Sequence, residues 1–525
     1  MGKVRAILSE FGQPFAIPMA KKLIDDHDWD IRYWIARSAI QKDVMTEFPD
    51  CIFHVSGKAR RGLPPEQPVD FKPRPLDADI LSRHAFTERH ALAQSDRLNL
   101  YDSTFTYGDR LRLYHHLLGY WLGVVEEIKP DVVVFLTIPH VIYDYVLYDI
   151  CRLQGVKTLI FEKTNIVGLI YAYEHLDTGP TEIAEAYRQA LAQPLPAKVE
   201  LSQRMEQVIT KAKGDYMDAV PVGLVNALKV SSPGTSQAGK SFASQKLDKL
   251  RRAWSRASIQ LSRIVGGNVP LTVGKLPGRP LTDRNMSRLE YIRTRLNIRL
   301  QKKRLLAAYT RLSSRPDLNR PYIYVTLQHQ PEQAANPQGG EFQHQYLMVE
   351  TLAALVPDGW SLYVKEHVAS LLSHSQFERN RTPAYYEALA KIPNVALVSQ
   401  DMGSFDLIDN ARAVATISGS AGWEAVLRSK PALLFGYSWY RNGEGVFQCH
   451  TLGQITSALE QIEAGYTVEE NKVRLYLSVL ETCGINAYNL PSWGQASGFS
   501  VEENGLQIAT ELVRLAGESA PHPQS

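Results

Sequence analysis

A turn of small polar residues in the second half of the chain has the composition of an anion-binding site. Ser418, Gly419 and Ser420 follow the apolar run 413–417 and precede a segment with helical character, 421–429. The first backbone N–H groups of a helix have no partner inside the helix, and the helix dipole adds positive potential there. Because small residues let an anion approach closely, the turn is predicted to hold a phosphate group. An ordinary strand–helix–strand crossover with a capped helix would show the same residues.

Two further polar turns follow predicted strands of the same region: Gln330-Pro331 after the strand 322–327, and Lys365-Glu366-His367 after the strand 361–364. The carboxyl ends of neighbouring parallel strands lie at one edge of a sheet, where ligands of open α/β sheets bind. The three turns are therefore expected to meet around one crevice. Each is weak evidence alone, since Gln-Pro is a common dipeptide and a single His at a strand end is more often structural.

The order and content of these turns resemble a known enzyme family. Ser-Gly-Ser-Ala-Gly-Trp-Glu-Ala, Lys-Pro-Ala-Leu-Leu-Phe-Gly and Trp-Tyr, all within 418–440, are similar to the donor-binding end of bacterial capsule-polysaccharide biosynthesis glycosyltransferases. In particular they resemble the retaining β-Kdo transferases, which use CMP-Kdo. Gln330-Pro331 resembles their Gln-Pro motif, and Lys365-Glu366-His367 resembles their Lys-Glu-His-Pro motif, with Val368 in place of the proline. The resemblance is best over residues 320–445.

The resemblance implies a role for each turn in binding the donor. The 418–420 turn would hold the nucleotide phosphate, and Glu424, one helical turn further on, would take the ribose hydroxyls. Lys365 and His367 would neutralise the phosphate and the sugar carboxylate as the bond to CMP breaks, because electrostatic stabilisation is usually the largest aid to such transfers. Gln330 would orient the sugar. The sequence shows no carboxylate cluster with metal-ligand spacing, so no metal and no cofactor besides the donor is expected.

The first half of the chain offers candidates for catalytic carboxylates. The apolar runs 131–136 and 156–161 flank a helix predicted over 141–153, the pattern of a parallel strand–helix–strand unit. Glu162 follows the second run and Asp144 lies on the first helical turn, so both are predicted at the ligand-binding edge. Retention at an anomeric carbon can use one carboxylate as nucleophile and another as acid/base, the roles predicted by position for this pair. Alternatively, Glu162 pairs with a cation and Asp144 caps its helix.

Alternation of apolar runs with helical segments predicts a fold of the α/β class. The expected architecture is GT-B-like, with two Rossmann-like domains facing a cleft and a basic helical insertion between them. The predicted units are an N-terminal, acceptor-side domain (1–175), a helical basic insertion or linker (176–320), a nucleotide-sugar-binding domain (321–480) and a tail (481–525). The tail carries a helix predicted over 501–515, which by analogy with two-domain transferases crosses back to the first domain.

Positive charge is concentrated in the predicted insertion. The formal net charge is +3, yet residues 240–320 contain 20 Lys and Arg and 4 Asp and Glu, so the rest of the chain is acidic. After a flexible linker predicted over 231–245, basic helices are predicted over 246–263 and 286–312. An amphipathic basic helix can lie on an anionic bilayer, although a helix packed on the sheet with a solvated basic face has the same pattern. Aromatic residues are few among these charges, which disfavours nucleic acid.

Composition restricts the remaining possibilities. The chain has 525 residues, of which 44% are hydrophobic and 22% charged, as in soluble globular proteins of two or three domains. No run of eighteen apolar residues occurs, and the N-terminal residues lack the apolar core of a secretory signal. The four cysteines lack metal-ligand spacing and suit a reducing compartment.

These observations predict a cytoplasmic glycosyltransferase, peripheral at the inner membrane, that transfers Kdo from CMP-Kdo to a capsular or O-antigen-type glycan or a lipid-linked acceptor. A CDP-glycerol-type phosphotransferase and a UDP-sugar glycosyltransferase or epimerase are alternative enzymes with a similar donor end. A membrane-associated, catalytically inactive scaffold of a capsule assembly complex is the alternative from another class, and Val368 in place of proline leaves room for it.

Overall fold

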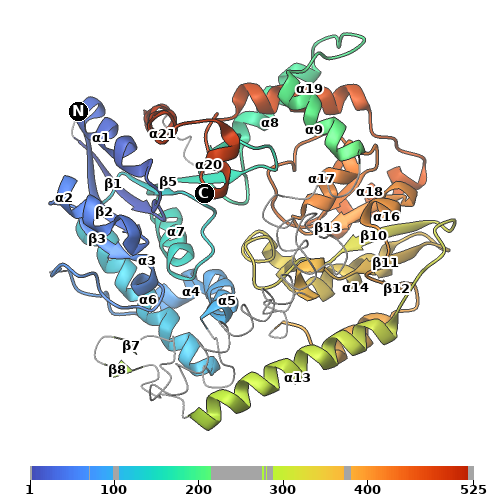
Figure 1. The fold of residues 1–525 in the computed structure, drawn as a ribbon, viewed down its shortest axis with the longest axis horizontal. Coiled ribbons are helices and arrows are strands. Elements are labelled where there is room, and N and C mark those ends of the chain that lie inside the picture. Colours follow the sequence, from blue (N-terminus) through green and yellow to red (C-terminus); the bar gives the residue numbers. More distant parts are fainter. Residues whose placement is uncertain are drawn as a thin grey trace, which may run out of the picture.

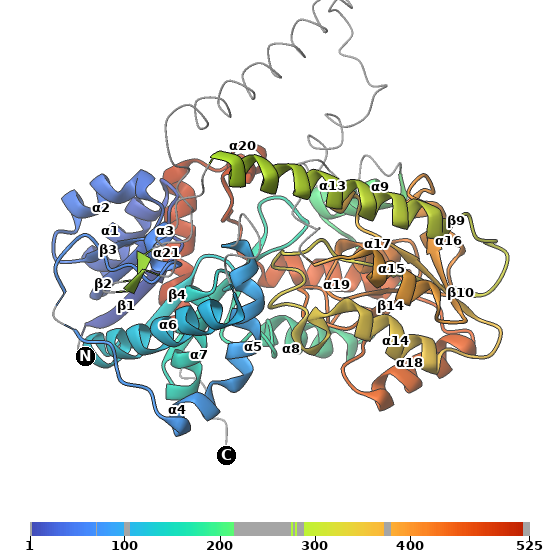
Figure 2. The same ribbon diagram turned by 90° about the horizontal axis from the view of Figure 1, so that it is seen from below.

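The computed structural model describes residues 3–69, 71–98, 106–214, 275–276, 279–280, 288–371 and 380–517. Within these ranges the chain forms two α/β domains that lie side by side (Figures 1 and 2). The linker predicted over 231–245 and the helix predicted over 246–263 lie outside the described residues.

The first domain is built on a six-stranded sheet of order β3-β2-β1-β4-β5-β6. Its strands are β1 (Val4–Ser9), β2 (Trp29–Ala36), β3 (Ile52–Val55), β4 (Val132–Phe135), β5 (Lys157–Lys163) and β6 (Ile170–Tyr173). All neighbours pair in parallel except β5 and β6. Every residue of β4 is buried, as expected for a parallel strand covered on both faces. The four strands predicted in this region are confirmed, and β3 and β6 are additional.

Helices cover both faces of this sheet: α1 (Ala16–His27), α2 (Gln41–Glu47), α3 (Ser56–Ala59), α4 (Ala78–Arg83), α5 (Ala85–Gln94), α6 (Tyr107–Ile128) and α7 (Tyr143–Gln154). The helix α6 begins at a capping box, in which Thr106 Oγ1 accepts the N–H of Asp109 at 3.3 Å and the Asp109 carboxylate accepts the N–H of Thr106 at 3.1 Å. Its apolar stripe packs with α5 and α7 on one face of the sheet, and α1 covers the other.

The second domain is built on a seven-stranded parallel sheet of order β15-β14-β13-β10-β11-β12-β9. Its strands are β9 (Ser313–Ser314), β10 (Tyr322–Thr326), β11 (Ser361–Lys365), β12 (Val395–Val398), β13 (Ala413–Thr416), β14 (Ala432–Leu434) and β15 (Val446–Gln448). The accompanying helices are α14 (Gln345–Leu355), α15 (Pro383–Ala390), α16 (Ser404–Asn410), α17 (Ser420–Leu427) and α18 (Leu452–Glu463). The five strands predicted here are confirmed, and the edge strands β9 and β15 are additional.

The chain crosses between the domains and returns. The helices α8 (Thr181–Leu191) and α9 (Gln203–Lys213) pack against α19 (Glu470–Cys483), so this part of the predicted insertion lies with the second domain. After α20 (Pro491–Ser497), the last helix, α21 (Val501–Gly517), packs on α1 of the first domain (Figure 1). Gly505 allows this approach, because a Cβ there would lie 2.6 Å from the carbonyl oxygen of Phe15. The predicted crossing back is confirmed.

The basic helix predicted over 286–312 is confirmed as α13 (Arg288–Leu312), which runs along one side of the molecule (Figures 1 and 2). Only its carboxyl-terminal part is anchored among the residues whose burial is described: Leu305 and Tyr309 are buried, and Tyr309 donates a hydrogen bond to the carbonyl of Val398 at 2.6 Å. Towards its start, Ile292, Leu296 and Leu300 are 39%, 50% and 50% exposed. A short strand pair, β7 (Lys275–Leu276) and β8 (Arg279–Pro280), precedes it. In the described part of the chain, no helix combines the length and apolar character needed to cross a bilayer.

Candidate functional site

The three motif-bearing turns lie at one edge of the second sheet. Ile323 of β10 pairs with Leu362 of β11 on one side and with Ala413 of β13 on the other, and all three strands run in the same direction. Their carboxyl ends are therefore neighbours. Because β10 leads to β11 on one side and the later β13 lies on the other, this is the point in the sheet where ligands of open α/β folds bind.

The turn predicted to hold a phosphate contacts the loop that follows β10. Ser418 Oγ donates to the carbonyl of Ala334 at 2.8 Å, and Gln328 Nε2 donates to Thr416 Oγ1 at 2.9 Å. A Cβ on Gly419 would lie 2.4 Å from Gln328 Nε2, so the Gln328 amide sits directly over the turn. The N–H of Gly419 already donates to Thr416 Oγ1, at 3.2 Å. A phosphate that reached this N–H would have to displace the Gln328 side chain.

Glu424 lies near Ser420 on the first turns of α17, as the predicted helix requires. The two side chains form a hydrogen bond, while burial raises the pKa of Glu424 above its ordinary value. The carboxyl group is thus held at the start of the helix, in the place predicted for a contact with ribose. Its role in binding stays a prediction.

Gln330 is held by a buried ion pair that the sequence analysis did not identify. Arg381 Nε donates to Glu366 Oε2 at 2.9 Å, and Arg381 Nη1 donates to Gln330 Oε1 at 2.5 Å. The Arg381 and Glu366 side chains are 3% and 0% exposed. Burial favours the neutral form of Glu366, but Arg381 and hydrogen bonds from Tyr386 and the N–H of His367 outweigh it, so the pKa of Glu366 is lowered. The middle residue of the Lys-Glu-His motif thereby orients the glutamine of the Gln-Pro motif.

His367 presents one proton donor to the edge of the site. The N–H of Ala369 donates to His367 Nδ1 at 3.1 Å, so the neutral ring carries its proton on Nε2. Burial lowers the pKa of His367, with Glu366 opposing the effect. Above pH 7 the ring therefore offers a neutral hydrogen bond to a ligand rather than a positive charge. Its ring centroid lies 6.2 Å from that of His329, beside Gln330.

Lys365 points to a different loop. Its Nζ donates to the carbonyl of Met402 at 2.5 Å and lies 3.5 Å from Ser404 Oγ. Burial lowers the pKa of Lys365 to about 8, while Asp401 and Asp406 oppose the shift. In this conformation Lys365 fixes the loop between β12 and α16, and its predicted contact with the donor stays a prediction.

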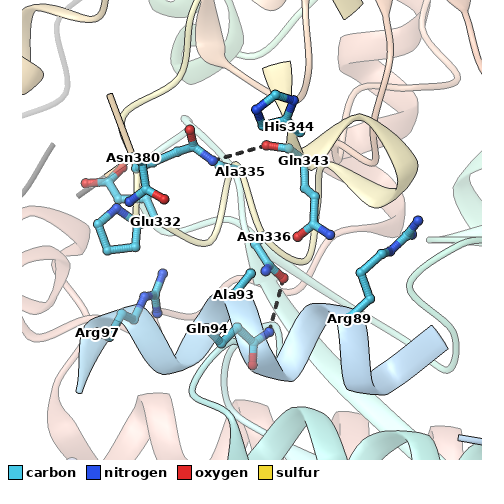
Figure 3. Close-up of a pocket in the computed structure, with 12 residues that line it drawn as sticks. Arg89, Ala93, Gln94, Arg97, Glu332, Ala335, Asn336, Gln343, His344 and Asn380 are labelled. Carbon is cyan, nitrogen blue, oxygen red and sulfur yellow. Dashed lines mark hydrogen bonds between the residues drawn. The ribbon is translucent and has the colours of Figure 1, made fainter. Parts of the chain in front are cut away.

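A cavity of about 300 Å³ opens between the two domains beside Gln330. Figure 3 shows Arg89, Gln94 and Arg97 extending from the first domain toward loops of the second. The remaining lining residues from the second domain are Gln330, Pro331, Glu332, Ala335, Asn336, Gln343, His344 and Asn380. Among the described residues, Gln94 Oε1, Gln343 Oε1 and Asn380 Nδ2 are buried without a hydrogen-bond partner. Unpaired buried amide atoms are rare in folded proteins, so three of them around one cavity make it a candidate site for a polar ligand.

Two arginines and one glutamate are the charged residues in the wall of this cavity. Arg97 Nη1 donates to the carbonyl of His140 at 2.9 Å, and its guanidinium lies close enough to Asp144 and Glu332 to be stabilised by both. Burial lowers the pKa of Lys163, which also faces Glu332. Burial raises the pKa of Glu332, and Arg97 and Lys163 oppose the shift. Arginines from the first domain thus face an otherwise polar cavity, an arrangement that suits an anion.

The two predicted catalytic carboxylates are buried, and neither lines this cavity. Asp144 Oδ1 accepts the N–H of Val141 at 2.8 Å, and burial together with the charge of Glu10 raises the pKa of Asp144 to about 8. Glu162 accepts from Tyr173 Oη at 2.8 Å and from Gln338 Nε2 of the second domain at 3.0 Å. Burial raises the pKa of Glu162 to about 7, with Arg441 and these hydrogen bonds opposing it. Their catalytic roles stay predictions.

Glu10 is a further acidic residue at the ligand-binding edge of the first sheet. It follows β1 directly and has a φ of 65°, which is unfavourable for a residue with a side chain. Tyr143 Oη donates to Glu10 Oε1 at 2.6 Å. Strained backbone at a strand end is common in active sites. A carboxylate placed after an apolar run is the sequence signal that predicts Glu162 at this edge. The same signal marks Glu10.

Comparison with known proteins finds a family model that resembles the second half of the chain. Residues 282–488 match the family model described as capsule polysaccharide biosynthesis protein. The predicted resemblance is confirmed. No curated protein matches the chain. In the part of the chain that the structure describes, no group of three or more His, Cys, Asp or Glu side chains could hold a metal ion.

Solved structures with some likeness include β-Kdo transferases and an epimerase. The β-Kdo 2,7 transferase KpsC of Thermosulfurimonas dismutans is 15% identical, with 38% of this chain and 67% of that chain covered and a TM-score of 0.20. The β-Kdo 2,4 transferase of the same organism is matched over 55% of its chain, so this protein spans about half of that structure. The UDP-GlcNAc 2-epimerase of Methanocaldococcus jannaschii is 12% identical, with 91% and 99% covered and a TM-score of 0.24.

Proposed function

We propose that this glycosyltransferase transfers Kdo from CMP-Kdo, with retention at the anomeric carbon, to a growing surface glycan or its lipid-linked primer. The proposal depends most on the interdomain cavity, where Gln330 stands beside two arginines of the first domain and three unpaired amide atoms. The match of residues 282–488 to the capsule family supports the reaction class.

The charges of the cavity suit this donor. CMP-Kdo carries an anionic phosphodiester and a sugar carboxylate, and Arg89 and Arg97 line the cavity with no aspartate among the lining residues and only Glu332 as an acid. In this proposal Gln330 and Asn380 bind sugar hydroxyls, and Arg97 meets the carboxylate. His367 Nε2 donates to the leaving phosphate as the glycosidic bond breaks, which lowers the energy of the charge that develops there.

Asp144 and Glu162 are the proposed proton-carrying residues. A pKa of about 8 for Asp144 and about 7 for Glu162 keeps each group wholly or partly protonated near neutral pH, so one of them can give its proton to the leaving phosphate and then, as a carboxylate, take the proton of the attacking acceptor hydroxyl. Glu162 is covered by Gln338 of the opposite domain. It can reach substrate only when the domains separate, so opening and closing of the cleft is part of the proposed cycle.

The donor is tested by incubating the protein with CMP-Kdo, CDP-glycerol and UDP-sugars in parallel, with and without a capsular oligosaccharide. The proposal predicts that CMP is released only from CMP-Kdo and faster when the oligosaccharide is present. Turnover of CDP-glycerol or of UDP-sugars alone contradicts it, and turnover of a UDP-sugar without any acceptor identifies an epimerase.

We also propose that α13 brings the enzyme to the cytoplasmic face of the inner membrane. The exposed apolar residues Ile292, Leu296 and Leu300 recur every four positions, so they share one face of the helix. Arg293, Arg299, Lys303 and Arg304 accompany them along the same helix. Apolar residues that enter the headgroup region, flanked by cations that meet anionic lipid, are the basis of peripheral membrane binding.

A further inference from the structure

A second interdomain cavity, of about 190 Å³, has a different chemical character. It lies on the other side of the hydrogen bonds that join His90 to Asn336, at 3.0 Å between His90 Nδ1 and Asn336 Oδ1 and 3.1 Å between Asn336 Nδ2 and the carbonyl of His90. Because the two residues belong to different domains, this contact separates the cavity from the one beside Gln330.

Aromatic rings form one wall of this cavity. Phe86 and His90, one turn apart on α5, have ring centroids 4.8 Å apart, and His90 lies 5.3 Å from Tyr145 of α7. Tyr148 continues the row at 6.2 Å from Tyr145. Phe86 is 45% exposed, although it is a large apolar side chain at the mouth of a cavity. Phe86 is the one ring of this row with solvent access, and the Arg89 guanidinium lies 4.7 Å from its centroid. An accessible apolar ring suits the C–H face of a sugar ring.

Tyr437 of the second domain supplies a ring on the opposite side. It stacks on His450, with centroids 5.4 Å apart, and the Arg441 guanidinium lies 5.1 Å from its centroid. Gly340 permits this position, because its φ is 50° and a Cβ there would lie 3.2 Å from the Tyr437 ring. The ring is therefore fixed from three sides and turned to the cavity.

One polar group in the wall lacks a partner. Tyr145 is 5% exposed, and its hydroxyl has no hydrogen bond to any residue that the structure describes. In contrast, the hydroxyl of Tyr148 accepts the N–H of Leu176 at 3.0 Å. The Tyr145 hydroxyl is not among the fully enclosed polar atoms that lack a partner, so it is accessible at the cavity wall, where a ligand with hydrogen-bonding groups can reach it.

The charges of this cavity oppose those of the first. Its lining includes three acids, Asp149, Asp177 and Glu341, and one cation, Arg152. Asp149 is already paired with His84 at 2.6 Å and with Arg152 at 3.1 Å. The exposed carboxylates of Asp177 and Glu341 can accept hydrogen bonds from hydroxyl groups, and they repel anions. An acidic sugar is thus disfavoured and a neutral, hydroxyl-rich one is favoured.

We propose that this second cavity binds one neutral sugar ring of the acceptor glycan, stacked on Phe86 and Tyr437 and hydrogen-bonded to the Tyr145 hydroxyl. The inference rests on the proposed function only in identifying the bound sugar as part of the acceptor. The binding of a neutral sugar follows from the cavity itself. A volume of 190 Å³, about six times the space of one water in the liquid, suits a single ring with the rest of the glycan outside.

Saturation-transfer NMR with methyl glycosides of neutral hexoses and N-acetylhexosamines, with free Kdo for comparison, tests the proposal on the full chain. We expect transfer to a neutral glycoside and little to Kdo at this cavity. Phe86→Ala and Tyr145→Phe should each weaken the neutral glycoside by about five-fold or more, as expected for one stacked ring or one hydrogen bond. The control Tyr107→Ala removes an aromatic that is 66% exposed at the start of α6, outside the cavity lining, and should change nothing.

Unchanged glycoside affinity in both cavity variants, or equal loss in the Tyr107→Ala control, overturns the inference. CMP affinity, measured in the same samples, should be equal in all variants and shows that each is folded. Glycoside binding that depends on Phe86 without any turnover of CMP-Kdo leaves the cavity assignment standing and contradicts the proposed function. Turnover of CMP-Kdo without such glycoside binding does the reverse.

Discussion

Replacing Arg381 by methionine should destabilise the second domain strongly and in a pH-dependent way. The variant leaves the Glu366 carboxylate, which is 0% exposed, without its counter-ion. It keeps hydrogen bonds from Tyr386 Oη at 2.9 Å, Ser370 Oγ at 3.1 Å and the N–H of His367 at 3.0 Å. Removing one partner of a buried pair typically costs about 3–5 kcal/mol, so we expect a fall in Tm of about 10 °C.

The sign of the pH dependence follows from the pKa of Glu366. In the native protein, burial raises the pKa of Glu366, but the stronger effect of Arg381 lowers it below the unfolded value. The ionised Glu366 therefore stabilises the fold above the unfolded pKa, and this stabilisation is lost as the pH falls. In Arg381→Met only burial and the remaining hydrogen bonds act, and the pKa of Glu366 rises. Protonation then relieves the buried charge, so the destabilisation should be larger at pH 8 than at pH 5.

Thermal and urea unfolding at both pH values measure this effect. Arg311→Met is the matched control, because Arg311 pairs with Glu387 at 3.0 Å on the surface, where the side chains are 67% and 45% exposed. That control should lose less than about 1 kcal/mol. Because Arg381 also holds Gln330, the residue proposed to bind the sugar, the double variant Arg381→Met/Glu366→Gln should regain stability but not the affinity for CMP-Kdo. Equal losses in Arg381→Met and Arg311→Met, or a loss that grows as pH falls, would refute the reasoning.

Three further predictions concern the cleft and the surface. Arg97→Gln should raise the KM for CMP-Kdo about ten-fold or more, because a charged hydrogen bond to the donor is lost. The control Arg112→Gln changes an arginine that is 57% exposed in an ion pair, and it should leave the kinetics unchanged. Steady-state assays measure both, and an unchanged KM in Arg97→Gln contradicts binding of the donor in this cavity. Burial raises the pKa of Glu162 to about 7 when the domains are closed, whereas separation of the domains exposes its carboxyl group to solvent. Separation should therefore become easier as the pH rises from about 4.5 to 7, and should not change further above pH 7. Small-angle scattering should show this trend, and Glu162→Gln should abolish it. The double variant Leu296→Asp/Leu300→Asp should lose binding to vesicles that contain anionic lipid, as measured by flotation. The control is Leu452→Asp/Val501→Asp, at two exposed apolar residues outside α13. Retained vesicle binding in the α13 variant contradicts the membrane role of this helix.

The elements with strong periodicity were predictable from sequence, and their packing partners were not. The stripe of α6 and its capping box at Thr106 identify that helix, and the apolar runs at β4, β10 and β13 identify buried parallel strands. The edge strands β9 and β15 are only two and three residues long and lack an apolar run, so no local pattern marks them. The motifs Gln-Pro and Lys-Glu-His gave the turns that meet at one edge.

The residues that hold those turns in place could be identified only from the structure. Arg381 lies in a polar segment with no periodic signal, yet it joins Glu366 to Gln330. Gln328 is one of several consecutive polar residues, and only the structure places its amide over Gly419. The opposite wall of the cavity comes from α5, some 240 residues away in sequence from its hydrogen-bond partner Asn336. Contacts between distant segments leave no pattern in one sequence, so such residues were not predictable.

A crystal structure of the protein with bound CMP tests the central claim most directly. The account predicts that the cytidylyl phosphate lies at the common edge of β13, β10 and β11, within hydrogen-bonding distance of His367 Nε2 and the 418–420 turn, with the Gln328 amide displaced and Gln330 and Arg97 facing the position of the sugar. Nucleotide bound elsewhere, or no binding by calorimetry at millimolar CMP, contradicts it.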